Sequence, residues 1–189
     1  TFILDPVMGD NGRLYSAYES SMLGHMKELV TLSNVLTPNL TEACFLTDIS
    51  YDAVSKLKGS ALSNSLYELS AKLSGRMKGG NGLVVISGID AGQYIGNYIY
   101  DRGFHGLIRM KKTGASRCGT GDVFSSVISA SLIQGDSLKD AVVLAARFIG
   151  KCIKVSDTYS TPLTDGVAFK DVLGMLTAHK SRSGTQNNH

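Results

Sequence analysis

The sequence has no tryptophan and only three prolines and three cysteines in 189 residues. Cys44, Cys118 and Cys152 show no CxxC or Cys/His spacing, and their odd number argues against a disulfide framework. A reducing compartment is therefore expected, and we predict a cytoplasmic protein. No apolar run reaches the roughly 18 residues that a membrane span needs, so no membrane partner is expected.

Charge is also modest, because 19 basic and 16 acidic residues give a net charge of +3. Most basic residues are scattered, which argues against a nucleic-acid partner. The exception is a cluster of Arg109, Lys111, Lys112 and Arg117, which fits either a local anion-binding patch or a solvated strand face. With 43% hydrophobic and 19% charged residues, the composition fits a globular α/β domain with a substantial core.

Apolar runs that end at Pro6, Leu36 and Ser87 predict buried strands. An antiparallel pair is predicted over 94–100 and 104–110, after a turn at 88–92, and 48–60 is predicted as a loop. Helical spacing predicts helices over 19–32, 40–46, 61–73, 123–133, 137–155 and 168–178. This alternation predicts a mostly parallel sheet with helices on both faces, followed by a polar tail at 179–189.

The first residues, Thr1 to Pro6, already read as a buried strand. Proteins seldom begin in mid-strand, so we expect the N-terminal strands of the sheet to be missing. Residues 1–178 would then be the C-terminal part of a single larger domain. A sheet without its first strands exposes an apolar edge, which predicts association or poor solubility of the isolated chain.

Gly119-Thr120-Gly121-Asp122 comes directly before an apolar stretch that is typical of a helix. The first N–H groups of a helix lack intrahelical partners, and together with the helix dipole they form an anion site. A carboxylate there would repel an anion, so Asp122 needs another role. The most economical role is to accept a proton from a hydroxyl that attacks a phosphate, which suggests a kinase. The motif alone is equally typical of a capped turn.

Polar side chains follow the predicted strands at their carboxyl ends, where open α/β sheets bind ligands. Asp5 and Asp10 follow the first strand, Asn39 and Glu42 the second, and Ser87 the third. We expect these residues and the glycine motif to meet on one rim. Asp5, Asp10 and Glu42 offer the oxygen ligands that Mg²⁺ prefers, and Asn39 adds an amide. Asn39 and Glu42 fit the capping box of a helix equally well.

Three segments in this order, Asp5-Pro-Val-Met-Gly-Asp10, Thr37-Pro-Asn-Leu-Thr-Glu42 and Gly119-Thr-Gly-Asp122, resemble the ribokinase-like superfamily. Within it they resemble the pyridoxal (pyridoxine, pyridoxamine) kinase branch, and the likeness extends to about Leu176. Hydroxymethylpyrimidine kinases tend to carry a cysteine where this chain has Asp122. Sugar kinases lack the Asp-Pro-Val-x-Gly-Asp run, so the vitamin branch is favoured.

The resemblance implies a ribokinase-like fold and ATP-dependent phosphorylation of the 5′-hydroxymethyl group of a B6 vitamer. Mg²⁺ would be the cofactor, with a monovalent cation left open, and ATP the co-substrate. The full-length form would be a homodimer. Residues 1–178 would carry the ATP and phosphoryl-transfer half of the domain and little of the vitamin pocket.

The implied roles follow from the matching positions. Asp122 would be the base, and Lys111 or Lys112 would neutralise phosphate charge. Asp5, Asp10, Asn39 and Glu42 would hold Mg²⁺ and its waters, Gly119, Thr120 and Gly121 would bind phosphoryl oxygens, and Ser87 would touch a phosphate.

Two alternatives remain open. One is a hydroxymethylpyrimidine kinase or a dual-specificity kinase. The other is a nucleotide-binding remnant without catalytic activity, against which Asp122 and the predicted metal carboxylates speak.

Overall fold

The computed structural model of the chain describes residues 1–177, which divide into two compact units. Unit 1 runs from Thr1 to Arg109, and unit 2 begins at Met110. The predicted polar tail at 179–189 lies outside the described residues. No helix within residues 1–177 is both long enough and apolar enough to cross a membrane.

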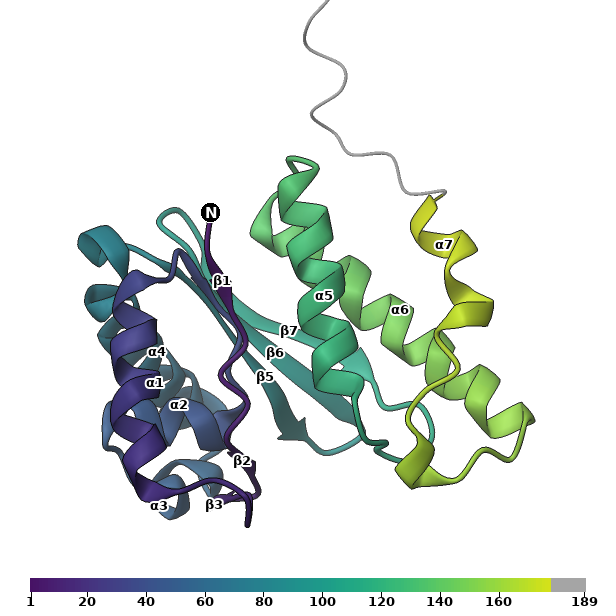
Figure 1. Cartoon of the computed structure of the whole chain (residues 1–189), viewed down its shortest axis with the longest axis horizontal. Coiled ribbons are helices and arrows are strands. Elements are labelled where there is room, and N and C mark those ends of the chain that lie inside the picture. Colours follow the sequence, from purple (N-terminus) through teal and green to yellow (C-terminus); the bar gives the residue numbers. More distant parts are fainter. Residues whose placement is uncertain (178–189) are drawn as a thin grey trace, which may run out of the picture. The chain divides into compact units, whose positions relative to one another are not determined.

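Unit 1 holds the sheet and the helices that cover one of its faces (Figure 1). In chain order its elements are β1 (Ile3–Leu4), β2 (Gly9–Asp10), β3 (Arg13–Leu14), α1 (Ser20–Leu32), β4 (Val35–Leu36), α2 (Leu40–Thr47), α3 (Tyr51–Ser55), α4 (Gly59–Arg76), η1 (Lys78–Gly80), β5 (Leu83–Ala91), β6 (Tyr94–Tyr100) and β7 (His105–Lys111), the last of which runs across the unit boundary.

The five-stranded sheet has the order β1-β4-β5-β6-β7. β1 pairs with β4 and β4 with β5 in parallel, whereas β5 and β6 are antiparallel, with a register shift between Ile86 and Ile89. Parallel neighbours place their carboxyl ends at the same edge of the sheet. The loops after β1 and β4 and the middle of β5 are therefore brought together.

The core of unit 1 lies between this sheet and the helices. Val84 and Ile86 of β5 are fully buried, as are Leu66, Leu69 and Leu73 of α4. These leucines recur at spacings of three and four, so they form one apolar stripe along α4. The stripe fixes α4 against the sheet and holds the parallel strands in place.

A separate two-stranded hairpin, β2 and β3, follows β1. Its turn is Asn11-Gly12, and both residues have positive φ, 51° and 77°. This conformation is that of a type I′ turn, which Asn-Gly favours. A Cβ at Gly12 would collide with the ring of Tyr51, so glycine is required here for packing as well.

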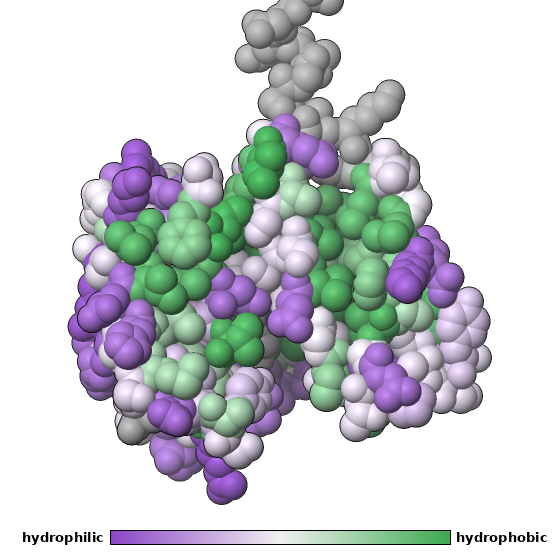
Figure 2. All heavy atoms as spheres, viewed as in Figure 1, coloured by the Kyte–Doolittle hydropathy of each residue, from purple (hydrophilic) through white to green (hydrophobic). Residues whose placement is uncertain are grey.

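The edge of the sheet at β1 is apolar. Figure 2 shows apolar side chains exposed over β1 and α1, where Phe2 is 39%, Leu29 40% and Leu32 58% exposed. These residues lie beside β1 and on α1, whereas Leu4 of β1 itself is buried, so the long apolar strand edge that the sequence predicts stays a prediction. An apolar edge strand of this kind favours association.

Unit 2 is helical after the end of β7. It contains α5 (Thr120–Ile133), α6 (Leu138–Thr158), η2 (Leu163–Asp165), η3 (Lys170–Val172) and α7 (Gly174–Thr177). α5 packs against α6, whose buried residues include Ala141, Ala145, Phe148 and Cys152. The hydroxyl of Ser137 accepts a hydrogen bond from the Asp140 N–H at 3.1 Å and caps α6.

Three predictions of local structure are wrong. The predicted loop over 48–60 contains the short helix α3, and the predicted turn at 88–92 is mostly the continuation of β5. The predicted last helix, 168–178, is two short pieces, η3 and α7, within the described residues. The other predicted helices and strands are confirmed to within a few residues at most boundaries.

Candidate active site

Asn39 joins three segments of unit 1 at the carboxyl ends of the strands. It is the N-cap of α2, where its Oδ1 accepts from the Glu42 N–H at 2.9 Å and its Nδ2 donates to the Gly9 carbonyl at 2.8 Å. Asn39 also forms a parallel β-bridge with Ser87, whose N–H donates to the carbonyl of Pro38 at 2.8 Å. The structure therefore brings Asn39, Glu42 and Ser87 together, as the strand order predicts.

The side chain of Glu42 is buried, with 4% exposed, and both its oxygens accept from the backbone. Oε2 accepts from the Asn39 N–H at 2.7 Å, which completes a capping box, and Oε1 accepts from the Met8 N–H at 3.1 Å. Glu42 thus links the loop after β1 to the start of α2. The sequence fits Glu42 either as a metal ligand or as part of a capping box, and the structure confirms the capping box.

Burial raises the pKa of Glu42 from its ordinary 4.5 to about 7. Hydrogen bonds from the N–H groups of Asn39, Met8 and Gly9 oppose the shift, and the charge of Asp5 adds to it. The buried carboxyl group therefore holds its proton to a higher pH than it does in the unfolded chain.

This shift makes folding stability depend on pH. Between pH 4.5 and 7 the folded chain binds more protons than the unfolded chain, so the free energy of unfolding is expected to fall as pH rises. The total loss is up to about 3 kcal/mol. Urea unfolding in metal-free buffer, on either side of this window, measures it. Glu42→Gln should remove most of the slope and the exposed Asp52→Asn should not; equal slopes in all three proteins would contradict the pKa.

Asp5 follows β1 and neighbours Glu42. The Thr37 hydroxyl donates to its Oδ1 at 3.0 Å, and its negative charge contributes to the raised pKa of Glu42. Mg²⁺ in phosphate-transfer sites is commonly held by one or two carboxylates, with waters and substrate phosphates as the remaining ligands. Two neighbouring carboxylates of like charge at the strand ends fit such an ion, which would relieve their repulsion.

Asp10 does not join this pair. Its side chain is exposed and accepts from the N–H and the Nδ2 of Asn11, at 2.8 and 3.0 Å. Burial raises the pKa of Tyr51, and the charge of Asp10 adds to this rise. Within residues 1–177 no group of three or more His, Cys, Asp or Glu side chains is placed to hold a metal ion. The predicted metal residues Asp5, Asp10 and Glu42 therefore do not form a three-carboxylate cluster.

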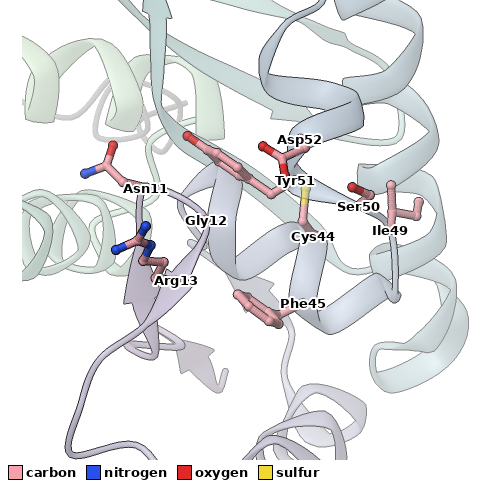
Figure 3. Close-up of a pocket in the computed structure, with 9 residues that line it drawn as sticks. All are labelled: Asn11, Gly12, Arg13, Cys44, Phe45, Ile49, Ser50, Tyr51 and Asp52. Carbon is pink, nitrogen blue, oxygen red and sulfur yellow. The ribbon is translucent and has the colours of Figure 1, made fainter.

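Beside the Asn11-Gly12 turn lies a pocket of about 420 Å³ (Figure 3). Its lining comes from the β2–β3 hairpin, from α2 and from the start of α3, and consists of Asn11, Gly12, Arg13, Cys44, Phe45, Ile49, Ser50, Tyr51 and Asp52. None of the predicted site residues lines this pocket. It is separate from the cluster of Asn39, Glu42 and Ser87.

The glycine motif of unit 2 starts α5. Gly119 is the N-cap in the left-handed conformation, with φ 70°, and no side chain caps the helix. The Thr120 hydroxyl instead donates back to the Arg117 carbonyl at 3.1 Å, and the first helical hydrogen bond runs from the Val123 N–H to the Gly119 carbonyl. The N–H groups of residues 120–122 therefore have no partner within the described chain, as an anion site requires.

Asp122 lies in the first turn of α5 with its side chain exposed. Its Oδ2 would be 3.8 Å from a Cβ built on Gly119, so the carboxylate lies back toward the start of the helix, close to the three N–H groups. A Cβ on Gly121 would meet nothing within 4 Å, which leaves open space beside the N–H groups for a ligand. The carboxylate, the three N–H groups and the open space therefore all lie at the first turn of α5.

The basic cluster upstream of the motif separates into two kinds of residue. Lys111 ends β7 and Lys112 follows it, and both are exposed. Arg117 is buried, with 6% exposed, and forms an ion pair with Asp157 at 2.8 Å. Arg117 is therefore not part of a solvated patch, and the interpretation of this cluster as four surface cations is wrong for this residue.

Sequence comparison places the chain among vitamin and pyrimidine kinases. A family model described as phosphomethylpyrimidine kinase matches residues 1–167. The hydroxymethylpyrimidine/phosphomethylpyrimidine kinase of Aquifex aeolicus is 29% identical over 155 residues, which cover 82% of this chain and 56% of that protein.

Solved structures of proteins described as kinases of this kind also resemble the chain. A "putative phosphomethylpyrimidine kinase" of Bacteroides thetaiotaomicron, crystallised with pyridoxal, has a TM-score of 0.81 and 34% identity over 93% of this chain and 60% of its own. Pyridoxal kinase from Lactobacillus plantarum has a TM-score of 0.79 and 25% identity, with the same coverage of both chains. The predicted α/β ribokinase-like fold is confirmed.

The chain spans about half the length of three curated relatives, 53%, 56% and 48%, and less than a third of two bifunctional thiamine biosynthesis proteins. The matching family model covers most of the chain, including all three motifs that the sequence singled out. The chain belongs to the phosphomethylpyrimidine kinase family, in the ribokinase-like group that these motifs predicted.

Proposed function

We propose that this chain carries the phosphoryl-transfer part of a kinase that uses ATP to phosphorylate the 5′-hydroxymethyl group of pyridoxal, pyridoxine or pyridoxamine. The observation that carries the proposal is the start of α5. There, three N–H groups without partners share one helix turn with the carboxylate of Asp122. The similarity to a structure that contains pyridoxal supports a B6 vitamer as the acceptor.

In this reaction the substrate hydroxyl oxygen attacks the γ-phosphorus of ATP. Asp122 accepts the hydroxyl proton as the new O–P bond forms, the bond from the γ-phosphorus to the β-phosphate oxygen breaks, and ADP leaves. The free N–H groups at Thr120, Gly121 and Asp122 hold the oxygens of the transferring phosphoryl group. They are fixed before the reaction, so they stabilise its charge without reorganising.

Unit 1 supplies the residues that would hold Mg²⁺, namely Asp5 and Glu42, with Asn39 fixing the position of Glu42. When bound, Mg²⁺ neutralises the charge of the ATP phosphates. Ser87, which is bridged to Asn39, would contact a phosphate. Lys111 or Lys112, exposed at the end of β7, would add positive charge along the nucleotide.

A second candidate is a hydroxymethylpyrimidine kinase or an enzyme with both activities. The matching family model and the Aquifex aeolicus relative favour it. Both candidates use a primary alcohol on a heteroaromatic ring, so the residues described here serve either. The carboxylate at position 122, where the pyrimidine kinases tend to carry cysteine, favours the B6 vitamers.

The test uses the full-length protein with Mg-ATP and either pyridoxal or hydroxymethylpyrimidine at equal concentration. We expect pyridoxal 5′-phosphate, followed by its absorbance and by ADP release, with a kcat/KM for pyridoxal at least about 10-fold above that for the pyrimidine. The reverse preference would establish the second candidate. ATP binding with no phosphorylated product from either alcohol would leave only a nucleotide-binding remnant.

A further inference from the structure

Arg117 lies two residues before Gly119, and its side chain is 3% exposed. A guanidinium does not lose its charge at any pH in a protein, so its burial needs compensating partners. The partners come from the end of α6 and from the segment after it. These elements are about 40 residues further along the chain than the motif itself.

The guanidinium makes three hydrogen bonds in a fork. Its Nη2 donates to the Asp157 carboxylate at 2.8 Å, and its Nη1 donates to the carbonyls of Thr161 and Pro162 at 2.7 and 3.2 Å. Its Nε is buried without a hydrogen-bond partner in the described chain. The orientation of the group is therefore set by the two Nη atoms alone, and both hold it to the region just after α6.

The backbone next to Arg117 is tied to the same region and to the motif. The Cys118 N–H donates to the Leu163 carbonyl at 3.2 Å, and the Arg117 carbonyl accepts from the Thr120 hydroxyl at 3.1 Å. The other carboxylate oxygen of Asp157, Oδ2, lies next to Gly114. A Cβ built on Gly114 would collide with this oxygen. Arg117 thus sits between a fixed anchor on α6 and the first turn of α5.

We propose that Arg117, anchored by Asp157, is a positioning residue that holds the Gly119-Thr120-Gly121-Asp122 turn in its anion-binding geometry. Its guanidinium does not contact the reacting atoms, because its two donating nitrogens are used by Asp157, Thr161 and Pro162. It acts through the backbone of residues 117–120. The catalytic part of this inference rests on the proposed kinase function, and the structural part does not.

The rival explanation is that Arg117 stabilises unit 2 as a whole, with no particular effect on the motif. The two explanations differ in where the chain loosens when Arg117 is changed. A positioning role predicts faster amide hydrogen exchange at Cys118 and Val123, whose N–H groups bond to Leu163 and Gly119. A general role predicts equally faster exchange in the core of α6, at residues such as Phe148.

The experiment compares full-length wild type with Arg117→Met, Arg117→Lys and the control Arg147→Met. Arg147 is an exposed arginine on α6, so the control removes the same charge from the same unit. Exchange is followed residue by residue by NMR, and kcat and KM are measured with Mg-ATP and pyridoxal. Lysine keeps the charge but cannot make the fork, so Arg117→Lys should lie between wild type and Arg117→Met.

For Arg117→Met we expect exchange at Cys118 and Val123 to rise at least about 10-fold more than at Phe148. We also expect kcat to fall about 10- to 100-fold, with KM for pyridoxal changed less than about 3-fold, because misplacement of aligned groups acts mainly on the chemical step. Arg147→Met should match wild type in both measurements.

Amide exchange that is equally faster throughout unit 2, or that is unchanged at Cys118 and Val123, would overturn the inference. So would an unchanged kcat in both Arg117 variants when wild type is an active kinase. If Arg117→Met does not fold, Arg117→Lys decides by the same two criteria. If wild type itself phosphorylates neither alcohol, the proposed function fails, and the exchange measurements still decide whether Arg117 holds the motif.

Discussion

Replacing Asp122 with asparagine in the full-length protein is expected to lower kcat for pyridoxal phosphorylation by about 100-fold. Asparagine has nearly the same shape but cannot accept the hydroxyl proton. Most of the catalysis of phosphoryl transfer comes from alignment and charge neutralisation, so the loss should lie at the lower end of the range for general bases. Steady-state kinetics at saturating Mg-ATP measures the change.

The matched control is Asp140→Asn, because Asp140 lies in the first turn of α6 as Asp122 does in α5. Both substitutions remove one negative charge near a helix N-terminus, which is worth about 0.3 to 1 kcal/mol in stability. Asp140→Asn should retain the wild-type kcat. If Asp122→Asn also retains it, the carboxylate is not the base, and the start of α5 serves only to bind the phosphoryl group.

Replacing Glu42 with alanine is expected to lower the free energy of unfolding by about 3 kcal/mol or more at pH 4.5, below the range in which the buried charge of Glu42 itself costs stability. The substitution removes the acceptor from two N–H groups, those of Met8 and Asn39, at a position where the side chain is only 4% exposed. Each unsatisfied buried donor costs about 1 to 3 kcal/mol. Urea unfolding of wild type and variant, followed by circular dichroism, gives the difference.

Glu68 provides the comparison, since it is an exposed glutamate on α4 in the same unit. Glu68→Ala should change stability by less than about 0.5 kcal/mol. Equal stability of the two alanine variants would mean that water replaces the carboxylate at Met8 and Asn39. The linking role assigned to Glu42 would then be withdrawn.

Much of the fold could be predicted because its long elements carry clear periodicity. The apolar stripe of α4 and the continuous run at the start of β5 are examples, and both are confirmed. The helix α3 was missed because five residues with one buried side chain, Val54, give no periodic signal. The predicted strand ends at Ser87, because a glycine such as Gly88 usually marks a turn. In the structure a register shift between Ile86 and Ile89 lets β5 continue past Gly88.

The hairpin of β2 and β3 was missed for a different reason. Asn11-Gly12 is the strongest short hairpin signal, but the strands on either side are only two residues long and do not alternate. This dipeptide alone indicates that Asp10 lies on a hairpin. Its side chain, turned toward Asn11, would then have been a weaker candidate for the metal set.

The candidate site could be predicted in its parts but not in its internal contacts. The strand order already placed Asn39, Glu42 and Ser87 together, and the structure confirms that placement. The same residue types support both capping and metal binding, so the sequence could not decide how the oxygens of Glu42 are used. Arg117 was counted with the surface cations because its partner Asp157 lies 40 positions away, and no local pattern links the two.

The hydrogen bond from the Cys118 N–H to the Leu163 carbonyl bears on the order in which the chain acquires its shape during synthesis. Translation proceeds from the N-terminus, so the glycine turn is synthesised before residue 163 exists. Until then the segment before α5 lacks both this bond and the acceptors of Arg117 at Thr161 and Pro162. The nascent protein can thus complete the sheet of unit 1 before the glycine turn is held in place by unit 2.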